Sequence, residues 1–174
     1  MLKAFGLLLL FVVPSLSVAQ DGAVVEKTTY TVHDSVWLRL QAMDAGLATK
    51  LKDSVDFFRI TYLSDGLKVK GFIAEPKAKG IYPCIISNRG GNRDFGMWNP
   101  LSILYFLGRM ASWNYVVVAS QYRGNDGGEG MEEFGGADVN DIFNIIPVLD
   151  QNPKADTSRI GIEGTGRGGM MTYH

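Results

Sequence analysis

The second half of the chain alternates between short, continuously apolar runs and longer segments in which apolar residues recur every three or four positions. The first pattern predicts strands buried on both faces of a sheet, and the second predicts amphipathic helices. The predicted strands are 83–87, 115–119 and 159–162, and the predicted helices are 100–112, 137–149 and 168–173. Pro147 should kink or end its helix, because proline removes a hydrogen bond of the helix interior. This order predicts a mainly parallel sheet that helices cover on both faces, as in an α/β fold.

A different pattern precedes this alternation. Residues 35–51 carry apolar side chains at helical spacing, and Asp34 is a suitable cap for that helix. Two strands follow, at 57–62 and 67–73. Ser64-Asp65-Gly66 lies between them, and Asp-Gly favours a tight hairpin because glycine accepts a positive φ angle. An N-terminal hairpin therefore leads into the parallel sheet.

The beginning of the chain has the character of a signal peptide. Lys3 provides a positive charge, an apolar run extends from Leu7 to Val13, and Ser17-Val18-Ala19 places small residues where signal peptidase requires them. The run is too short to span a bilayer, which takes about 20 apolar residues. We expect cleavage after Ala19 and a secreted or periplasmic protein with no stable membrane span.

Composition is that of a folded chain and argues against a nucleic-acid partner. Of the 174 residues, 46% are hydrophobic and 20% are charged, and the formal net charge is −1. Cys84 is the sole cysteine, so no internal disulfide can form, and its apolar surroundings predict a small buried core residue. The histidines are His33 and His174, and neither has local support as the partner of a catalytic thiol.

The glycine-rich segment after the last predicted strand has the layout of a nucleophile elbow. Such an elbow is a strand, a tight turn written G-x-S-x-G and a helix, and its serine projects into the active site. Gly164 and Gly168 occupy the flanking positions, and Gly166 stands where the serine is expected. The flanking glycines let strand and helix approach closely, whereas Gly166 supplies no side-chain nucleophile.

The same residues match a second motif. Gly164, Gly166 and Gly169 spell G-x-G-x-x-G, the dinucleotide-binding fingerprint, which also follows a strand and opens a helix. That fingerprint normally lies in the first strand–helix turn of its domain, whereas several predicted strands precede it here. Its acidic residue, expected about 20 positions later, would lie beyond His174. The elbow is favoured, and a dinucleotide-binding domain stays an alternative.

Other segments of the chain support the elbow by their order. They are Tyr62-Leu63-Ser64-Asp65-Gly66-Leu67, Asn88-Arg89-Gly90-Gly91-Asn92-Arg93, Gln121-Tyr122-Arg123-Gly124-Asn125 and Ser158-Arg159-Ile160-Gly161-Ile162. Together with Arg167-Gly168-Gly169, they resemble stretches of the prolyl oligopeptidase catalytic domain, a serine peptidase family of the α/β-hydrolase superfamily, and of its dienelactone-hydrolase-like relatives. The resemblance covers residues 57–173. It implies an incomplete α/β-hydrolase domain at 55–174 that ends just after the elbow. The signal peptide at 1–19 and a segment with a helix at 20–54 precede that domain.

The resemblance also implies roles for backbone groups near the elbow. The N–H of Arg167, next to the nucleophile position, would be one oxyanion donor, and the second would come from Gly91 or its neighbour Gly90. Donors of this kind stabilise the oxyanion that develops during acyl transfer. The loop 122–130 would border the site without a catalytic role.

In this family the acid and the histidine of the triad follow the elbow in chain order, which puts both beyond His174. Asp126, Asp138 and Asp141 precede the elbow, so we expect them to be surface or capping residues. The strand that ends at Ile162 should be an open edge, because the hydrolase sheet continues with later strands.

The sequence thus predicts an N-terminal fragment of an exported serine hydrolase or peptidase that cleaves peptide or ester bonds by acyl transfer. This chemistry needs no metal or organic cofactor. The chain should be inactive as it stands, because Gly166 replaces the serine and the acid and histidine are missing. The alternatives are a non-catalytic binding protein on the hydrolase scaffold and a dinucleotide-binding domain.

Overall fold

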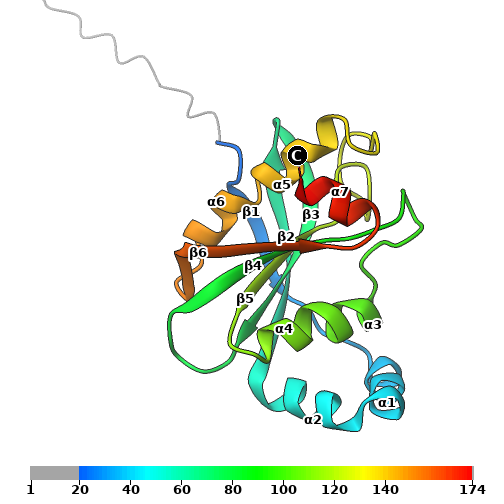
Figure 1. Cartoon of the computed structure of the whole chain (residues 1–174), viewed down its shortest axis with the longest axis vertical. Helices are drawn as coiled ribbons and strands as arrows, with labels where there is room; N and C mark the ends of the chain where they lie inside the picture. The colour runs from blue at the N-terminus through cyan, green and yellow to red at the C-terminus, as the bar shows by residue number, and fades with distance from the viewer. Residues whose placement is uncertain (1–19, 174) are drawn as a thin grey trace, which may run out of the picture.

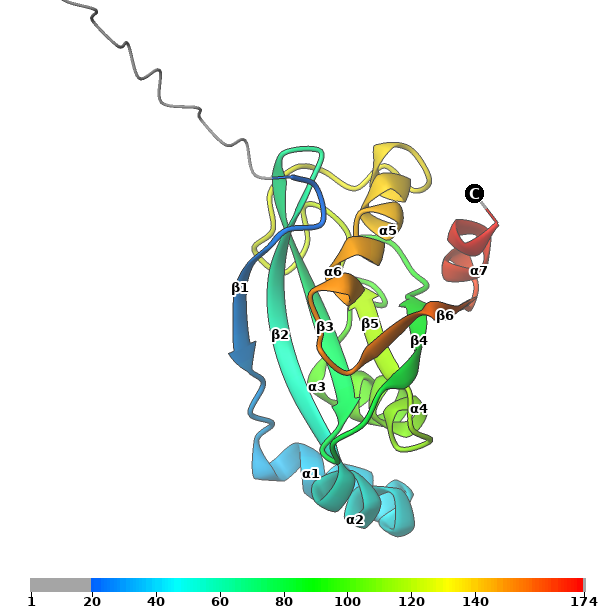
Figure 2. The ribbon, with the colours of Figure 1, turned by 90° about the vertical axis from the view of Figure 1, so that its left-hand side faces the viewer.

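The computed structural model describes residues 20–173, so the predicted signal peptide, 1–19, and His174 lie outside the described residues. Six strands form one sheet in the order β1-β2-β3-β5-β4-β6 (Figures 1 and 2). Their bounds are Val24–Thr29 (β1), Val55–Ser64 (β2), Leu67–Pro76 (β3), Tyr82–Asn88 (β4), Val116–Ser120 (β5) and Ala155–Gly164 (β6). The β1–β2, β2–β3 and β3–β5 pairs are antiparallel, and β5, β4 and β6 are mutually parallel. The sheet is therefore mixed, with the hairpin on one side and the parallel strands of the α/β fold on the other.

The hairpin and the open edge both agree with the sequence. Asp65 and Gly66 have φ angles of 53° and 75°, and Ser64 pairs with Leu67 across this two-residue turn. Positive φ at both central positions is the geometry that matches the twist of the flanking strands. At the opposite side of the sheet, β6 pairs with β4 alone among the described strands, as Figure 2 shows.

The pattern of apolar residues did not predict β1. Most of its side chains are exposed, so the alternation that marks a half-buried strand is missing. Its register with β2, from Val24 opposite Tyr62 to Thr29 opposite Phe58, holds it in the sheet. Its place depends on backbone pairing, which local hydrophobicity does not encode.

Residues 35–51 form part of two helices rather than the single predicted helix. They are α1 (Asp34–Met43) and α2 (Ala45–Ser54). Asp44 separates them, because its backbone leaves the helical region and its carboxylate caps the N-terminus of α2. The side chain that caps α1 is His33, not the predicted Asp34.

The two longer predicted helices are also subdivided. Residues 100–111 form α3 (Pro100–Ser102), the π-helix η1 (Ile103–Gly108) and α4 (Arg109–Ala111). Residues 137–150 form the 3-10 helix η2 (Ala137–Val139), α5 (Asn140–Phe143) and α6 (Ile146–Asp150). Pro147 lies in the first turn of α6, where its missing N–H costs no helical hydrogen bond. The last helix, α7 (Arg167–Thr172), follows β6.

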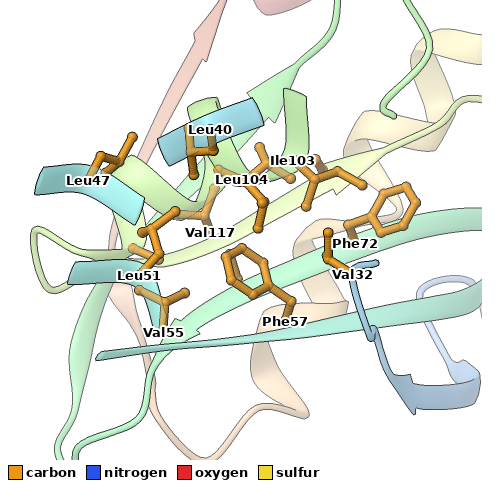
Figure 3. Close-up of a cluster of buried hydrophobic side chains, with 14 of the residues drawn as sticks. Val32, Leu40, Leu47, Leu51, Val55, Phe57, Phe72, Ile103, Leu104 and Val117 are labelled. Carbon is orange, nitrogen blue, oxygen red and sulfur yellow. The ribbon is translucent and has the colours of Figure 1, made fainter. Parts of the chain in front are cut away.

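Helices cover both faces of the sheet, as predicted. Successive residues of β5 enter different apolar clusters, because neighbouring side chains of a strand point to opposite faces. The first core packs α1, α2, η1 and α4 against one face, and Figure 3 shows Leu51, Phe57 and Leu104 meeting there. The second core packs α5, α6 and α7 against the other face.

Cys84 lies in the second core and is 1% exposed, which agrees with the prediction of a buried core residue. Burial raises the pKa of its thiol to about 11. None of the helices within residues 20–173 is both long and apolar enough to cross a membrane.

Candidate active site

The glycines of the predicted elbow lie at the junction of β6 and α7. Gly166 has φ 57° and ψ −123°, a conformation that strains a residue with a side chain by roughly 1–3 kcal/mol. A Cβ atom built on Gly166 would meet no atom within 4 Å. The turn therefore presents position 166 to open space, as a side chain that attacks a substrate requires.

Gly164 and Gly168 are needed for close packing rather than for an unusual φ. A Cβ on Gly164 would overlap the carbonyl group of Gly168. A Cβ on Gly168 would overlap the carbonyl oxygen of Asn88 and lie 2.9 Å from that of Arg89. The end of β6, the start of α7 and the end of β4 thus touch one another through backbone atoms.

A crevice lies at the carboxyl ends of β4 and β6. These strands are parallel neighbours, with Asn88 opposite Gly164. The chain leaves β4 toward the helices of the first core and leaves β6 into α7, which packs on the second core. Ligands of open α/β sheets bind where neighbouring loops diverge in this way.

An open pocket of about 220 Å³ occupies this crevice. Its walls come from the loop after β4, the elbow and the segment that leads into η1. They comprise Asn88, Arg89, Gly90, Gly96, Met97, Trp98, Asn99, Ser102, Phe106, Glu163 and Thr165. The predicted elbow and the predicted oxyanion loop therefore border one pocket.

The residues predicted to form the oxyanion hole lie close together. Gly90 lines the pocket, and a Cβ on it would be 2.9 Å from the carbonyl oxygen of Thr165 in the elbow. The carbonyl oxygen of Gly91 accepts a hydrogen bond from the Arg167 guanidinium at 3.3 Å. Arg167 is the first residue of α7, so its backbone N–H has no partner within the helix. Donation by these N–H groups to a bound carbonyl stays a prediction.

The side chain of Arg167 is buried, which the sequence did not predict. It forms ion pairs with Glu132 and Asp138. Its guanidinium carbon lies 5.0 Å from the ring centre of Tyr122 and 4.7 Å from that of Phe134. The expectation that Asp138 is a surface or capping residue is wrong, because its carboxylate is fully buried and balances this guanidinium.

Glu132 connects this ion pair to the loop after β4. Its carboxylate lies 3.2 Å from the Arg89 guanidinium, and it accepts hydrogen bonds from Asn125 at 2.6 Å and from the backbone N–H of Arg93 at 2.9 Å. The buried cluster holds as many carboxylates as guanidinium groups. It fixes the loop 122–130 against the predicted oxyanion loop, which is a structural role.

Asp141 also contradicts the expectation of a surface or capping residue. It is fully buried, lies 2.8 Å from the Arg123 guanidinium, and accepts a hydrogen bond from Ser64 at 2.6 Å. Burial raises the pKa of Asp141, and the hydrogen bonds from Arg123 and Ser64 oppose that rise. Arg123 also pairs with Asp65 of the hairpin turn at 2.7 Å. Asp126, by contrast, is partly exposed and pairs with Arg59 at 2.8 Å.

Several side chains of the pocket wall were not singled out from the sequence, and three of them give the pocket its charge and its aromatic surface. Glu163 directly precedes the elbow, and its carboxylate accepts a hydrogen bond from the buried Ser87. Trp98 and Phe106 come from the segment between β4 and β5. Strand alternation could have placed Glu163 on the sheet face opposite Ile162, but nothing local indicates that two distant aromatic residues join it.

Known proteins resemble the chain in sequence and in structure. The prolyl oligopeptidase family matches residues 103–174. YtmA, an uncharacterized peptidase of Bacillus subtilis (strain 168), is 45% identical over 117 residues, which cover 67% of this chain and 44% of YtmA. An acylaminoacyl peptidase of Pyrococcus horikoshii superposes with a TM-score of 0.55 and 29% identity, over 73% of this chain and 22% of that chain.

The esterase LipA of Xanthomonas oryzae, which degrades the rice cell wall, superposes with a TM-score of 0.65 over 88% of this chain and 44% of its own. Its 16% identity shows the fold alone. The chain spans less than half the length of each of these proteins. The chain therefore has a partial α/β-hydrolase fold, and its sequence is similar to the prolyl oligopeptidase family, whose model matches residues 103–174.

Proposed function

We propose that the chain provides the elbow and pocket of an exported hydrolase for peptide or ester substrates, and that Gly166 makes it catalytically silent. The backbone of Gly166, at φ 57° and ψ −123° directly after β6, is the observation that carries the proposal. In the family reaction a serine at this place attacks the substrate carbonyl, an acyl-enzyme forms, and water hydrolyses it. Glycine has no side-chain oxygen, so no acyl-enzyme can form at position 166.

The loss of the serine is large in kinetic terms. Removing the nucleophile of a serine protease lowers kcat about a million-fold, or about 8 kcal/mol in activation free energy. Among residues 20–173 the sole histidine is His33, which caps α1 and does not line the pocket. Gly166→Ser alone therefore gives the new hydroxyl no histidine partner among residues 20–173, and we expect no useful turnover from that variant.

The experiment uses a chimera in which the B. subtilis relative supplies the sequence that follows its own match to this chain. Two versions differ only at position 166, one with glycine and one carrying Gly166→Ser. Both are treated with a fluorophosphonate probe, and adducts are located by mass spectrometry. We expect labelling at position 166 of the serine version and none of the glycine version.

Two outcomes would overturn the proposal. If the folded serine chimera does not label, position 166 is not the nucleophile position of an elbow. If the unmodified chain labels at another residue and turns over an ester, that other residue is the nucleophile and the chain is not silent.

A binding protein on the same scaffold is the second candidate. It is favoured by the open pocket beside Gly166, which needs no side chain at that position. Saturable binding of a peptide or ester without turnover by the unmodified chain is its expected signature.

A dinucleotide site at Gly164, Gly166 and Gly169 has less support, because β6 is the sixth strand of the sheet and the fingerprint belongs to the first strand–helix turn of its domain. Titration with a dinucleotide, followed by tryptophan fluorescence, tests it.

Export is part of the proposal and rests on the sequence of residues 1–19 alone. N-terminal sequencing of the mature protein should begin at Gln20. A soluble product that retains Met1 would exclude cleavage after Ala19.

A further inference from the structure

We infer that the pocket beside the elbow selects substrates by a positively charged group on a short apolar stem, which the Glu163 carboxylate and the aromatic walls of Trp98 and Phe106 bind together. The inference rests on the proposed function in taking this pocket as the place for the group next to the scissile bond. It adds the chemical class of that group.

The carboxylate of Glu163 is held in place and has one oxygen to spare. Ser87 is fully buried and donates its hydroxyl hydrogen to Oε1 of Glu163. Within residues 20–173, Oε2 of Glu163 has no hydrogen-bond or ion-pair partner. Because Ser87 fixes one oxygen, the other can accept a hydrogen bond from a ligand with little loss of side-chain freedom.

The charge of Glu163 is not cancelled by the other charged residue that lines the pocket. The Arg89 guanidinium is buried and pairs with Glu132 while donating to the backbone of Gln121. Arg167 in turn is balanced by Glu132 and Asp138. Since these positive charges are already paired, the pocket has a net negative charge from Glu163.

The aromatic walls suit a cation that carries an apolar stem. The Trp98 indole N–H donates to the carbonyl of Ser120 at 3.1 Å. Its backbone N–H donates to the Gln121 side chain at 2.9 Å, and its carbonyl accepts from the same side chain at 2.8 Å. These bonds fix Trp98, so its ring is a preformed wall rather than one that must be ordered by a ligand.

Phe106 is 54% exposed, although Leu104 and Leu107 of the same π-helix, η1, are fully buried core residues. Its ring packs edge-on against Tyr105, with 5.2 Å between centroids. Cations bind favourably over aromatic faces, and carboxylates bind ammonium and guanidinium groups. At about 220 Å³, the pocket is smaller than the roughly 300–1,000 Å³ of sites for drug-sized ligands, which suits a single basic side chain or an arylmethyl ammonium.

The test compares benzylammonium with benzyl alcohol, which has the same ring and stem without the charge. Binding of each to the unmodified chain is measured by titration calorimetry and by fluorescence. We expect benzylammonium to bind tenfold or more tightly than the alcohol, the effect of about one charge-assisted hydrogen bond. The preference should shrink as salt is raised, because the pocket is open.

Glu163→Gln keeps the shape and the acceptor for Ser87 but removes the charge, so the two ligands should then bind alike. Glu26→Gln is the matched control, because it removes the same charge from β1, at the opposite edge of the sheet. It should leave the preference unchanged. Benzylammonium should quench part of the tryptophan fluorescence, and Trp98→Phe should abolish the quench. This last measurement keeps the inference testable if Glu163→Gln fails to fold.

Equal binding of the two ligands to the unmodified chain, or a preference that survives Glu163→Gln in a folded protein, would overturn the inference. Neither binding measurement depends on position 166. If the chimera carrying Gly166→Ser is labelled at position 166 but benzylammonium binds no more tightly than benzyl alcohol, only the present inference is refuted. If benzylammonium is preferred but the chimera is not labelled, only the hydrolase proposal is refuted.

Discussion

Gly168→Ala tests how closely the start of α7 packs against the end of β4 at the elbow. A Cβ on Gly168 would lie 2.9 Å from the carbonyl oxygen of Arg89 and closer still to that of Asn88. Comfortable contacts between carbon atoms are about 3.5–4.0 Å, so β4 and α7 must move apart by on the order of 1 Å. That movement also strains the hydrogen bond from the Asn88 side chain to Thr172, which joins the same two elements at 3.2 Å.

The expected loss of stability follows from these contacts. Overpacking typically costs 1–3 kcal/mol, and the obstructing atoms here are backbone, so we take about 3 kcal/mol. Alanine is favoured over glycine within a helix by about 1 kcal/mol, which offsets part of the loss. A net loss of about 2 kcal/mol in the free energy of unfolding corresponds to a Tm lower by roughly 4–8 °C for a chain of this size.

The assay is urea denaturation followed by circular dichroism, with Gly161→Ala as the matched control. Gly161 lies in β6, and the nearest atom to a Cβ built there is the carbonyl oxygen of Cys84 at 3.9 Å, an ordinary contact. The control should be as stable as the unmodified chain or up to about 1 kcal/mol more stable. If Gly168→Ala is as stable as Gly161→Ala, the end of β4 does not press on α7 and the geometry of the elbow is wrong.

Three further predictions concern ionisable side chains. Asp141→Asn should cost about 3–5 kcal/mol in unfolding free energy, because it leaves the Arg123 guanidinium without its buried partner. The control, Asp126→Asn, removes a partly exposed ion pair and should cost at most about 1 kcal/mol. Equal losses for the two variants in urea denaturation would contradict this prediction. Hydrogen bonds from Arg123 and Asn140 hold the pKa of Asp65 below its ordinary value of 3.8, so its contribution is complete above pH 3.8 and is lost as the pH falls through the lowered pKa. Asp65→Asn should therefore lower the free energy of unfolding at pH 7, measured by urea denaturation, by no more than about 1 kcal/mol, since the side chain is partly exposed. The difference in free energy from the unmodified chain should narrow at lower pH, and a difference that widens there would refute the assignment. The Cys84 thiol, with its pKa raised to about 11 by burial, should resist iodoacetamide at pH 8 in the folded chain and react fully in denaturant, and rapid labelling of the native chain would show that it is accessible.

Local signals in the sequence were enough to predict much of the fold. Apolar runs and helical spacing placed β4, β5 and β6 and the helices between them, because each pattern depends on residues only a few positions apart. The Asp65-Gly66 turn was predicted for the same reason, since its φ angles depend on those residues alone. The spacing of Gly164, Gly166 and Gly168 likewise indicated a tight strand–helix turn before any contact was known.

The tertiary structure decided everything that depends on distant partners. Arg167 and Glu132 are 35 positions apart, and the order of the strands and loops makes them a buried pair. The same holds for Asp141 with Arg123 and Ser64. Asp141 was expected to be a surface or capping residue because it precedes the elbow in the chain, where the triad acid does not lie. A carboxylate in water needs no partner, whereas a buried one must be paired, so its burial cannot be inferred until the fold supplies that partner.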